Sequence, residues 1–356
     1  MDFSAKSEIR SSLYIKHEIC EPKTKVGFMK THKTGSSTIQ NILLRYAEMY
    51  ELNIMLPNKG NRLNYYKNGL HQPFQMRWLK HVPWHQQLAS TQGYDMTLLH
   101  TKWNHEVFRE ALGQKAVFVT ILRDPSDTFE SLYSYFELQN FYKMELPKFI
   151  QRLDQDPSLS DKRFHGYLGL NMQIFEFGFN LNNRNNKTAI DKKIKEIESN
   201  FDLVMIMEKL PESLVLLADS LCLPLFMMAS LKLNERKPYL KVGLSETEKS
   251  ILRKHQSADE ILYEHFKLRL DQQIEDFGVE RMRQSVEDLA RINNFIRKNC
   301  IIGEAPKRNQ TNLYKSQRAV TFEVKEKVKE CMRMAQDETA FVEELRQAQK
   351  KRLLDS

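Results

Sequence analysis

A run of cationic, hydroxylated and glycine residues, KTHKTGSST, lies between an apolar segment and a helix-like segment near the start of the chain. Ammonium groups, hydroxyl groups and the free N–H groups at the start of a helix are the partners that anionic oxygens prefer. The run therefore predicts an anion site. The alternative is an ordinary strand–helix turn in which a serine caps the helix. The residues of the run are Lys30, Thr31, His32, Lys33, Thr34, Gly35, Ser36, Ser37 and Thr38.

The run differs from the phosphate loop of nucleoside-triphosphate enzymes. In that loop a lysine follows the second glycine directly, whereas Ser36 follows Gly35 here and both lysines precede it. The next predicted strands end in His100 and Arg123 and not in an acidic residue that would help to hold Mg²⁺. Cations and hydroxyl groups without a metal carboxylate favour transfer of a sulfuryl group, which carries fewer negative charges than a phosphoryl group. A phosphotransferase of the P-loop kinase type is the alternative, and we expect no metal requirement.

A second anion site is predicted where Arg123 ends the apolar segment 116–122 and Ser131 lies on the helix that follows. A guanidinium and a hydroxyl that converge can hold a phosphate, the guanidinium in a bidentate manner. The alternative is that Arg123 pairs with Asp124 or Asp127. A donor with phosphates at two places, such as 3′-phosphoadenosine 5′-phosphosulfate, would require both anion sites.

Two histidines are candidates for the proton acceptor that a hydroxyl nucleophile needs. The ordinary pKa of histidine, about 6.5, suits that role near neutral pH. His32 lies inside the cationic run, and His100 ends the segment 96–100 at the strand end where open α/β sheets bind ligands. We favour His100 as the base, with His32 orienting the acceptor or sharing the role. The alternatives are a core or capping role for His100 and a backbone contact for His32.

Lys30 and Lys33 would neutralise the sulfuryl group and the bridging oxygen of the leaving group. Trp103, three residues after His100, is our best candidate for an aromatic face that stacks on an acceptor sugar. His100 would also contact the acceptor. The alternative is that Trp103, like Trp78 and Trp84, is a core aromatic residue.

Short apolar segments alternate with helical patterns through the part of the chain that carries these residues. Such alternation predicts an α/β fold with a parallel sheet covered on both faces. The composition of the segment 56–82 predicts an irregular excursion from the regular elements, and that of 182–193 predicts an exposed loop. From Ser245 onward the pattern is helical and charged, and it ends in an amphipathic helix, or a pair of helices, over 320–354. The predicted strands are 26–30, 96–100, 116–122 and 203–207, and the predicted helices between and after them are 37–51, 126–138 and 211–221.

Composition excludes several classes of protein. The 356 residues are 41% hydrophobic, which excludes a disordered chain. No CxxC spacing occurs among the four cysteines, which disfavours a zinc site; a Cys300–Cys331 disulfide is a hypothesis, since the pairing is open. The formal charge of +8 reads as a solvated surface around a few functional cations, so we expect no nucleic-acid partner.

The segments FMKTHKTGSSTIQNILLRYAE and ILRDPSDTFESLYSYF resemble the galactose-3-O-sulfotransferase family. The likeness continues through LLHTKWNHEVF, NMQIFEFGF, FDLVMIMEKLPESLVLLADSLC and LKLNERK, over about residues 20 to 300. It implies the sulfotransferase variant of the P-loop fold, a central parallel sheet flanked by helices with a helical C-terminal part. It also implies transfer of a sulfuryl group from 3′-phosphoadenosine 5′-phosphosulfate to galactose, at the 3-hydroxyl, on a glycolipid or glycoprotein glycan.

Site residues follow from the positions of the matching motifs. The resemblance implies that 30–38 binds the 5′-phosphosulfate and that Arg123 with Ser131 binds the 3′-phosphate. Lys232 and Asn234, with Arg236, match a further family motif and would close over the nucleotide; a solvated charged turn is the alternative. Both His32 and His100 match histidines of the family.

Family members are Golgi type II membrane proteins with a luminal catalytic domain. We therefore expect a Golgi location, although no run approaches the roughly 18 apolar residues of a membrane span, and the N-terminal anchor is expected to be missing from this chain. The expected division is an extension over 1–19, a catalytic domain over 20–300 and a helical segment over 301–356. A non-catalytic nucleotide- or glycan-binding module is the remaining alternative.

Overall fold

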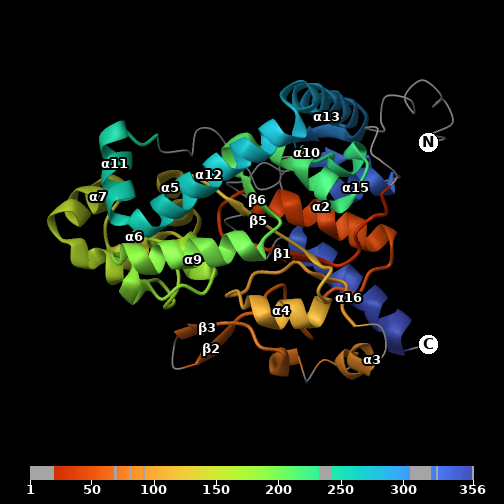
Figure 1. Ribbon diagram of the computed structural model, residues 1–356, viewed down its shortest axis with the longest axis horizontal. Helices are drawn as coiled ribbons and strands as arrows, with labels where there is room; N and C mark the ends of the chain where they lie inside the picture. The colour runs from red at the N-terminus through yellow and green to blue at the C-terminus, as the bar shows by residue number, and fades with distance from the viewer. Residues whose placement is uncertain are drawn as a thin grey trace.

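The computed structural model describes residues 20–67, 70–79, 82, 84–90, 93–231, 243–304, 322–325 and 328–354. A parallel sheet of four strands in the order β4-β1-β5-β6 lies at the centre (Figure 1). Every residue of β1, β4 and β6 is buried, as in a sheet with both faces covered. The predicted α/β fold with a parallel sheet is confirmed. The strands are β1 (Val26–Met29), β4 (Met96–Thr97), β5 (Val117–Leu122) and β6 (Leu203–Ile206).

Helices cover both faces of this sheet. Figure 1 shows α2 (Ser36–Met49) and α4 (His105–Leu112) on opposite sides of the strands. Both α10 (Leu210–Leu221) and α12 (Ser257–Phe277) pack against β6. The other helices are α3 (His85–Ser90), α5 (Pro125–Tyr135), α6 (Leu138–Tyr142), α7 (Leu146–Gln155), α8 (Met172–Glu176), α9 (Lys187–Asn200), α11 (Glu246–His255), α13 (Val279–Cys300), α15 (Lys329–Ala335) and α16 (Glu338–Leu354).

Three predicted segments differ from the structure. The excursion 56–82 contains a short hairpin of β2 (Tyr65–Lys67) and β3 (Leu70–Gln72). Part of the predicted loop 182–193 is helical, because the Asn186 side chain accepts a hydrogen bond from the Ala189 amide and caps α9. The C-terminal segment does contain two helices, but β8 (Phe322–Val324) precedes them and pairs with β7 (Ile301–Glu304).

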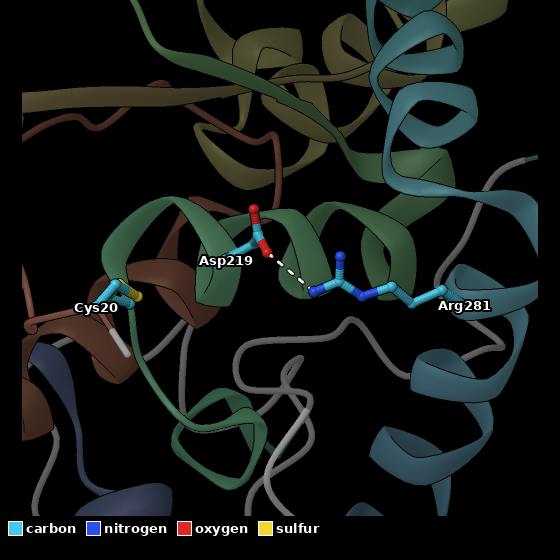
Figure 2. The surroundings of a disulfide bond; sticks show 4 residues. Cys20, Asp219 and Arg281 are labelled. Atoms are coloured by element: carbon cyan, nitrogen blue, oxygen red, sulfur yellow. Dashed lines mark hydrogen bonds and ion pairs between the residues drawn. A yellow bond between two sulfur atoms is a disulfide. The ribbon is translucent and has the colours of Figure 1, made fainter. Parts of the chain in front are cut away.

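Two disulfide bonds join distant parts of the described chain. The Cys300–Cys331 bond that the sequence suggested is present and joins α13 to α15. A second bond joins Cys20 to Cys222 at the end of α10. Figure 2 shows Asp219 on the same helix directed toward Arg281 of α13, with 3.5 Å between their oxygen and nitrogen atoms. The end of α10 is thus an attachment point for both the N-terminal segment and α13.

No helix in the described ranges is both long and apolar enough to cross a membrane.

The turn between β1 and α2 has an unusual backbone. Lys33 and Gly35 have positive φ angles of 61° and 80°. A Cβ atom at Gly35 would lie 2.3 Å from Sδ of Met207, so the Met207 side chain would have to move to make room for it. Among the described residues no side chain caps α2, and its first turn contains no acidic residue. The N–H groups that begin α2 therefore keep their partial positive charge at the surface of the turn.

We predict that Gly35→Ala lowers the free energy of unfolding by about 3 kcal/mol, because the new methyl group meets Met207 and the positive φ disfavours alanine. Urea denaturation measures this loss. The matched control is Gly60→Ala, where φ is 76° and nothing lies within 4 Å of the added Cβ. That control should lose only about 1 kcal/mol. Equal losses in the two variants would show that the Met207 contact does not restrict the turn.

Candidate functional site

Three hydroxyl groups of the cationic run fix its own shape. Oγ1 of Thr31 donates to the carbonyl of Ile121 at 2.6 Å, which ties the turn to the end of β5. Thr34 pairs with Thr31 at 2.6 Å, and Ser36 donates to the Thr31 carbonyl. The predicted ligand-binding hydroxyls of these three residues are thus engaged within the protein. Ser37 and Thr38 lie in the first turn of α2, where their backbone amides begin the helix.

The two lysines of the run lie in different surroundings. Lys33 is partly exposed, and its Nζ atom lies 3.8 Å from the ring centroid of Tyr135. Lys30 is 1% exposed; its ammonium donates to Oε1 of Gln40 at 2.7 Å and pairs with Glu338. The ammonium of a buried, paired lysine is less accessible to an anion than that of a partly exposed lysine. Lys33 is therefore the stronger anion-binding candidate of the two.

Arg123 and Ser131, the residues of the second predicted anion site, lie on neighbouring elements. Arg123 follows β5, and its guanidinium donates to the carbonyl of Lys33 at 3.2 Å. Ser131 lies on α5 and is 9% exposed. Asp124 pairs with Arg253 at 2.8 Å and Asp127 with Lys249 at 3.6 Å, so these carboxylates have other cationic partners. Arg123 therefore contacts the backbone of the turn that carries Lys33.

The two candidate histidines lie against each other. The rings of His32 and His100 stack with 4.0 Å between their centroids. Nδ1 of His100 lies 2.9 Å from the carbonyl oxygen of Lys30, which can only accept, so Nδ1 carries the proton and Nε2 keeps a lone pair. Desolvation lowers the pKa of His100 well below its ordinary value, and the charges of Lys30 and Arg62, with that of His32 when its ring is protonated, lower it further. His100 is therefore neutral at physiological pH.

His32 is held by a buried carboxylate. Its backbone N–H donates to Oε2 of Glu176 at 2.9 Å, and its Nδ1 atom hydrogen-bonds Oε1 of the same residue. This pairing puts the proton of the neutral ring on Nδ1 and leaves the lone pair on Nε2. The Nε2 atom is buried, and none of the described residues offers it a hydrogen bond. The ring thus presents one basic nitrogen in a fixed orientation.

Glu176 is a candidate functional residue that sequence reasoning missed. It lies on α8 and is 1% exposed. Asp259 of α12 holds the start of α8. Its carboxylate accepts hydrogen bonds from the backbone amides of Gln173 at 3.0 Å and Ile174 at 2.7 Å. Burial raises the pKa of Asp259 to about 7. The available signal was an acidic residue inside the apolar run NMQIFEFGF, since a carboxylate in such a run needs a polar partner.

His32, His100 and Glu176 could also be read as a metal site, since one possible ligand atom of each lies within 4.8 Å of the others. Nδ1 of His100 already donates to the Lys30 carbonyl, and Nδ1 of His32 already bonds Glu176. Lys30 adds a positive charge next to His100. This geometry suits proton transfer better than coordination of a cation.

Trp103 does not lie in the site. It is 4% exposed and stacks on Phe108 with 4.3 Å between ring centroids, so the structure places it in the core. A ring packed in this way has no free face for a sugar. Phe136 is the better candidate, because it is partly exposed and its ring centroid lies 6.2 Å from that of His32. Lys232, Asn234 and Arg236 lie outside the described residues.

Comparison with known proteins identifies the family of the chain. The sequence model of the family described as Galactose-3-O-sulfotransferase matches residues 5–338. Galactosylceramide sulfotransferase of Bos taurus is 31% identical over 80% of this chain and 66% of its own length. Galactose-3-O-sulfotransferase 2 of Homo sapiens is 30% identical over 82% of this chain and 72% of its own length.

The chain spans just under two thirds of the bovine relative's length. The family model, by contrast, covers most of this chain, including the cationic run, both histidines, Arg123 and Glu176. The resemblance seen in the sequence is therefore confirmed, and the chain belongs to the galactose-3-O-sulfotransferase family.

Proposed function

We propose that this protein is a carbohydrate sulfotransferase. It moves a sulfuryl group from 3′-phosphoadenosine 5′-phosphosulfate to a hydroxyl, the 3-hydroxyl, of galactose on a glycolipid or glycoprotein glycan. The observation that carries the proposal is that one turn holds both Lys33, the anion-binding candidate, and His32, whose Nε2 lone pair is oriented by Glu176. Family membership supports the same chemistry, since its relatives are named for galactose and galactosylceramide sulfotransfer.

The residues present suit the donor, and we assign the fold to the P-loop-type sulfotransferases. The 5′-phosphosulfate would meet the start of α2, which has neither a side-chain cap nor an acidic residue in its first turn. Lys33 adds a cation there, and Gly35 keeps the turn free of a side chain. Arg123 and Ser131 would hold the 3′-phosphate. Closure by Lys232 and Asn234 stays a prediction.

In the transfer step, Nε2 of His32 accepts the proton of the acceptor hydroxyl while the hydroxyl oxygen forms a bond to sulfur. The bond between sulfur and the bridging oxygen breaks, and adenosine 3′,5′-bisphosphate leaves. Glu176 stabilises the imidazolium that forms, as a buried carboxylate does in other histidine-based sites. Lys33 neutralises the charge that develops on the bridging oxygen. No step requires a proton from Lys30.

We assign the base to His32, which reverses the order that the sequence suggested. His100 donates to a backbone carbonyl and has a lowered pKa, so it accepts a proton less readily. His32 has a carboxylate to stabilise its charged form. His100 would position His32 by stacking and would contact the acceptor with its Nε2 atom.

We also propose an oxidising compartment, as in the Golgi lumen. Two disulfide bonds use all four cysteines of the chain. Structural disulfides persist in secretory compartments and are rare in the cytosol.

Lys33→Ala should lower kcat/KM by at least about 100-fold, because a cation aimed at the leaving group is lost. Arg123→Ala should raise the donor KM by about tenfold or more, because a bidentate phosphate contact is lost. The assay follows labelled sulfate from the donor to a terminal β-galactoside. The control is Lys187→Ala, on a side chain that is 80% exposed. Full transfer in both site variants would contradict the assignment, and Mg²⁺-dependent transfer of phosphate from ATP would support a kinase instead.

His32→Ala should lower kcat by about 100-fold or more, the range expected for loss of a general base. His100→Ala should cost only about tenfold, because it removes a stacking partner and not the proton acceptor. Single-turnover rates with labelled donor measure both effects, and His265→Ala, at a partly exposed position of α12, serves as control. If His100→Ala proves the more damaging change, the base is His100 and the assignment is reversed.

A further inference from the structure

An ion pair joins the start of the turn between β1 and α2 to the C-terminal helix, α16. Lys30 stands at the end of β1, and Glu338 is the first residue of α16, 308 positions later in the sequence. Their side chains are 1% and 11% exposed. The second carboxylate oxygen of Glu338 accepts a hydrogen bond from Nδ2 of Asn61 at 3.0 Å. Three distant segments of the chain therefore meet at one carboxylate.

The position of Glu338 is fixed by the packing of α16. The side chain of Gln349 accepts a hydrogen bond from the backbone amide of Ile54 at 2.8 Å and donates one to the Ile54 carbonyl at 3.0 Å. Arg346 donates to the carbonyl of Pro57 at 2.8 Å, and Arg352 donates to Asn53 at 2.6 Å. These bonds hold α16 along the segment that leads to Asn61. Glu338 thus begins a helix that is anchored to the segment 53–60 by several hydrogen bonds.

The residues around Glu338 contact the segment that carries His100. The backbone carbonyl of Lys30 accepts the hydrogen bond from His100. Arg62, next to Asn61, forms a backbone bridge with His100. The guanidinium of Arg62 donates to the hydroxyl of Tyr167 at 3.2 Å, and the Tyr167 ring lies 6.0 Å from that of His32. Glu338 and Asn61 therefore lie nearer to His100 than to His32 along these contacts.

The charges divide the site into two parts. Arg123 contacts the backbone of Lys33, in the part proposed to bind the anionic donor. The charge of Lys30 is balanced by Glu338, and the guanidinium of Arg62 donates to a hydroxyl, so this second part is rich in hydrogen-bonding groups. A neutral sugar needs hydrogen-bond donors and acceptors, which this second part offers.

We propose that Glu338 and Asn61 form a recognition site for the acceptor sugar, in which the Glu338 carboxylate accepts a hydrogen bond from a sugar hydroxyl. The proposal rests on the proposed function and names the residues that select its acceptor. Glu338 would determine specificity, because a carboxylate accepts hydrogen bonds from a hydroxyl at one position and leaves an epimer without that contact.

The test compares Glu338→Gln with Glu344→Gln, a matched control on the same helix whose carboxylate pairs with Arg333. Acceptor KM is measured with a methyl β-galactoside, and donor-site binding with adenosine 3′,5′-bisphosphate by thermal shift. Glu338→Gln should raise acceptor KM by about tenfold, the loss expected for one charged hydrogen bond. Nucleotide binding should change less than the acceptor KM, because we assign the donor to Lys33, Arg123 and Ser131. The control should change neither value.

Tighter nucleotide binding with unchanged acceptor KM would overturn the proposal, because Glu338 would then only restrain Lys30 from the donor. Equal behaviour of the two variants would also overturn it. If Glu338→Gln does not fold, Asn61→Ala replaces it, with the same expected rise in acceptor KM. Galactoside binding is also followed by ligand-observed NMR with the bisphosphate present. A parent protein that binds the galactoside but transfers no sulfate would refute the proposed function and leave this site standing.

Discussion

The pairing of His32 with Glu176 is the interaction on which the rest of the site depends. A carboxylate that is 1% exposed is costly to bury, and the structure offsets that cost with two hydrogen bonds from one residue. The same two bonds fix the tautomer and the orientation of the imidazole. Losing either partner of such a buried pair typically costs about 3–5 kcal/mol, so the pair constrains both stability and chemistry.

Much of the surrounding fold serves to position these two residues. Asp259 of α12 holds the start of α8, which brings Glu176 to the turn. Thr31 ties the same turn to β5 through the Ile121 carbonyl. His100 covers one face of the His32 ring from the segment after β4. The sheet, α8 and α12 therefore together fix the orientation of the His32 ring. The proposed anion-binding side chain Lys33 is the next residue along the chain.

The sheet could be read from the sequence, because its signals are local, whereas the two anion sites stay predictions. Apolar runs define β1 and β5, and the cationic residues stand directly at their ends. The roles of Glu176 and Glu338 could not be read in this way, since each depends on a contact with a residue far away in sequence, His32 and Lys30 respectively. Trp103 illustrates a different limit: an aromatic residue near a site looks the same in sequence whether its ring is buried or open. The hydroxyls of Thr31, Thr34 and Ser36 also looked like ligand donors, but the turn uses them for its own structure.

The central claim is that Glu176 holds His32 with its proton on Nδ1 and its lone pair on Nε2. Long-range ¹H–¹⁵N correlation NMR of the histidine-labelled protein reports this tautomer directly, and a His32→Gln sample assigns the signal. The account predicts that the neutral ring of His32 is protonated at Nδ1, and that Glu176→Gln removes this preference. A neutral His32 ring protonated at Nε2 in the parent protein would contradict it.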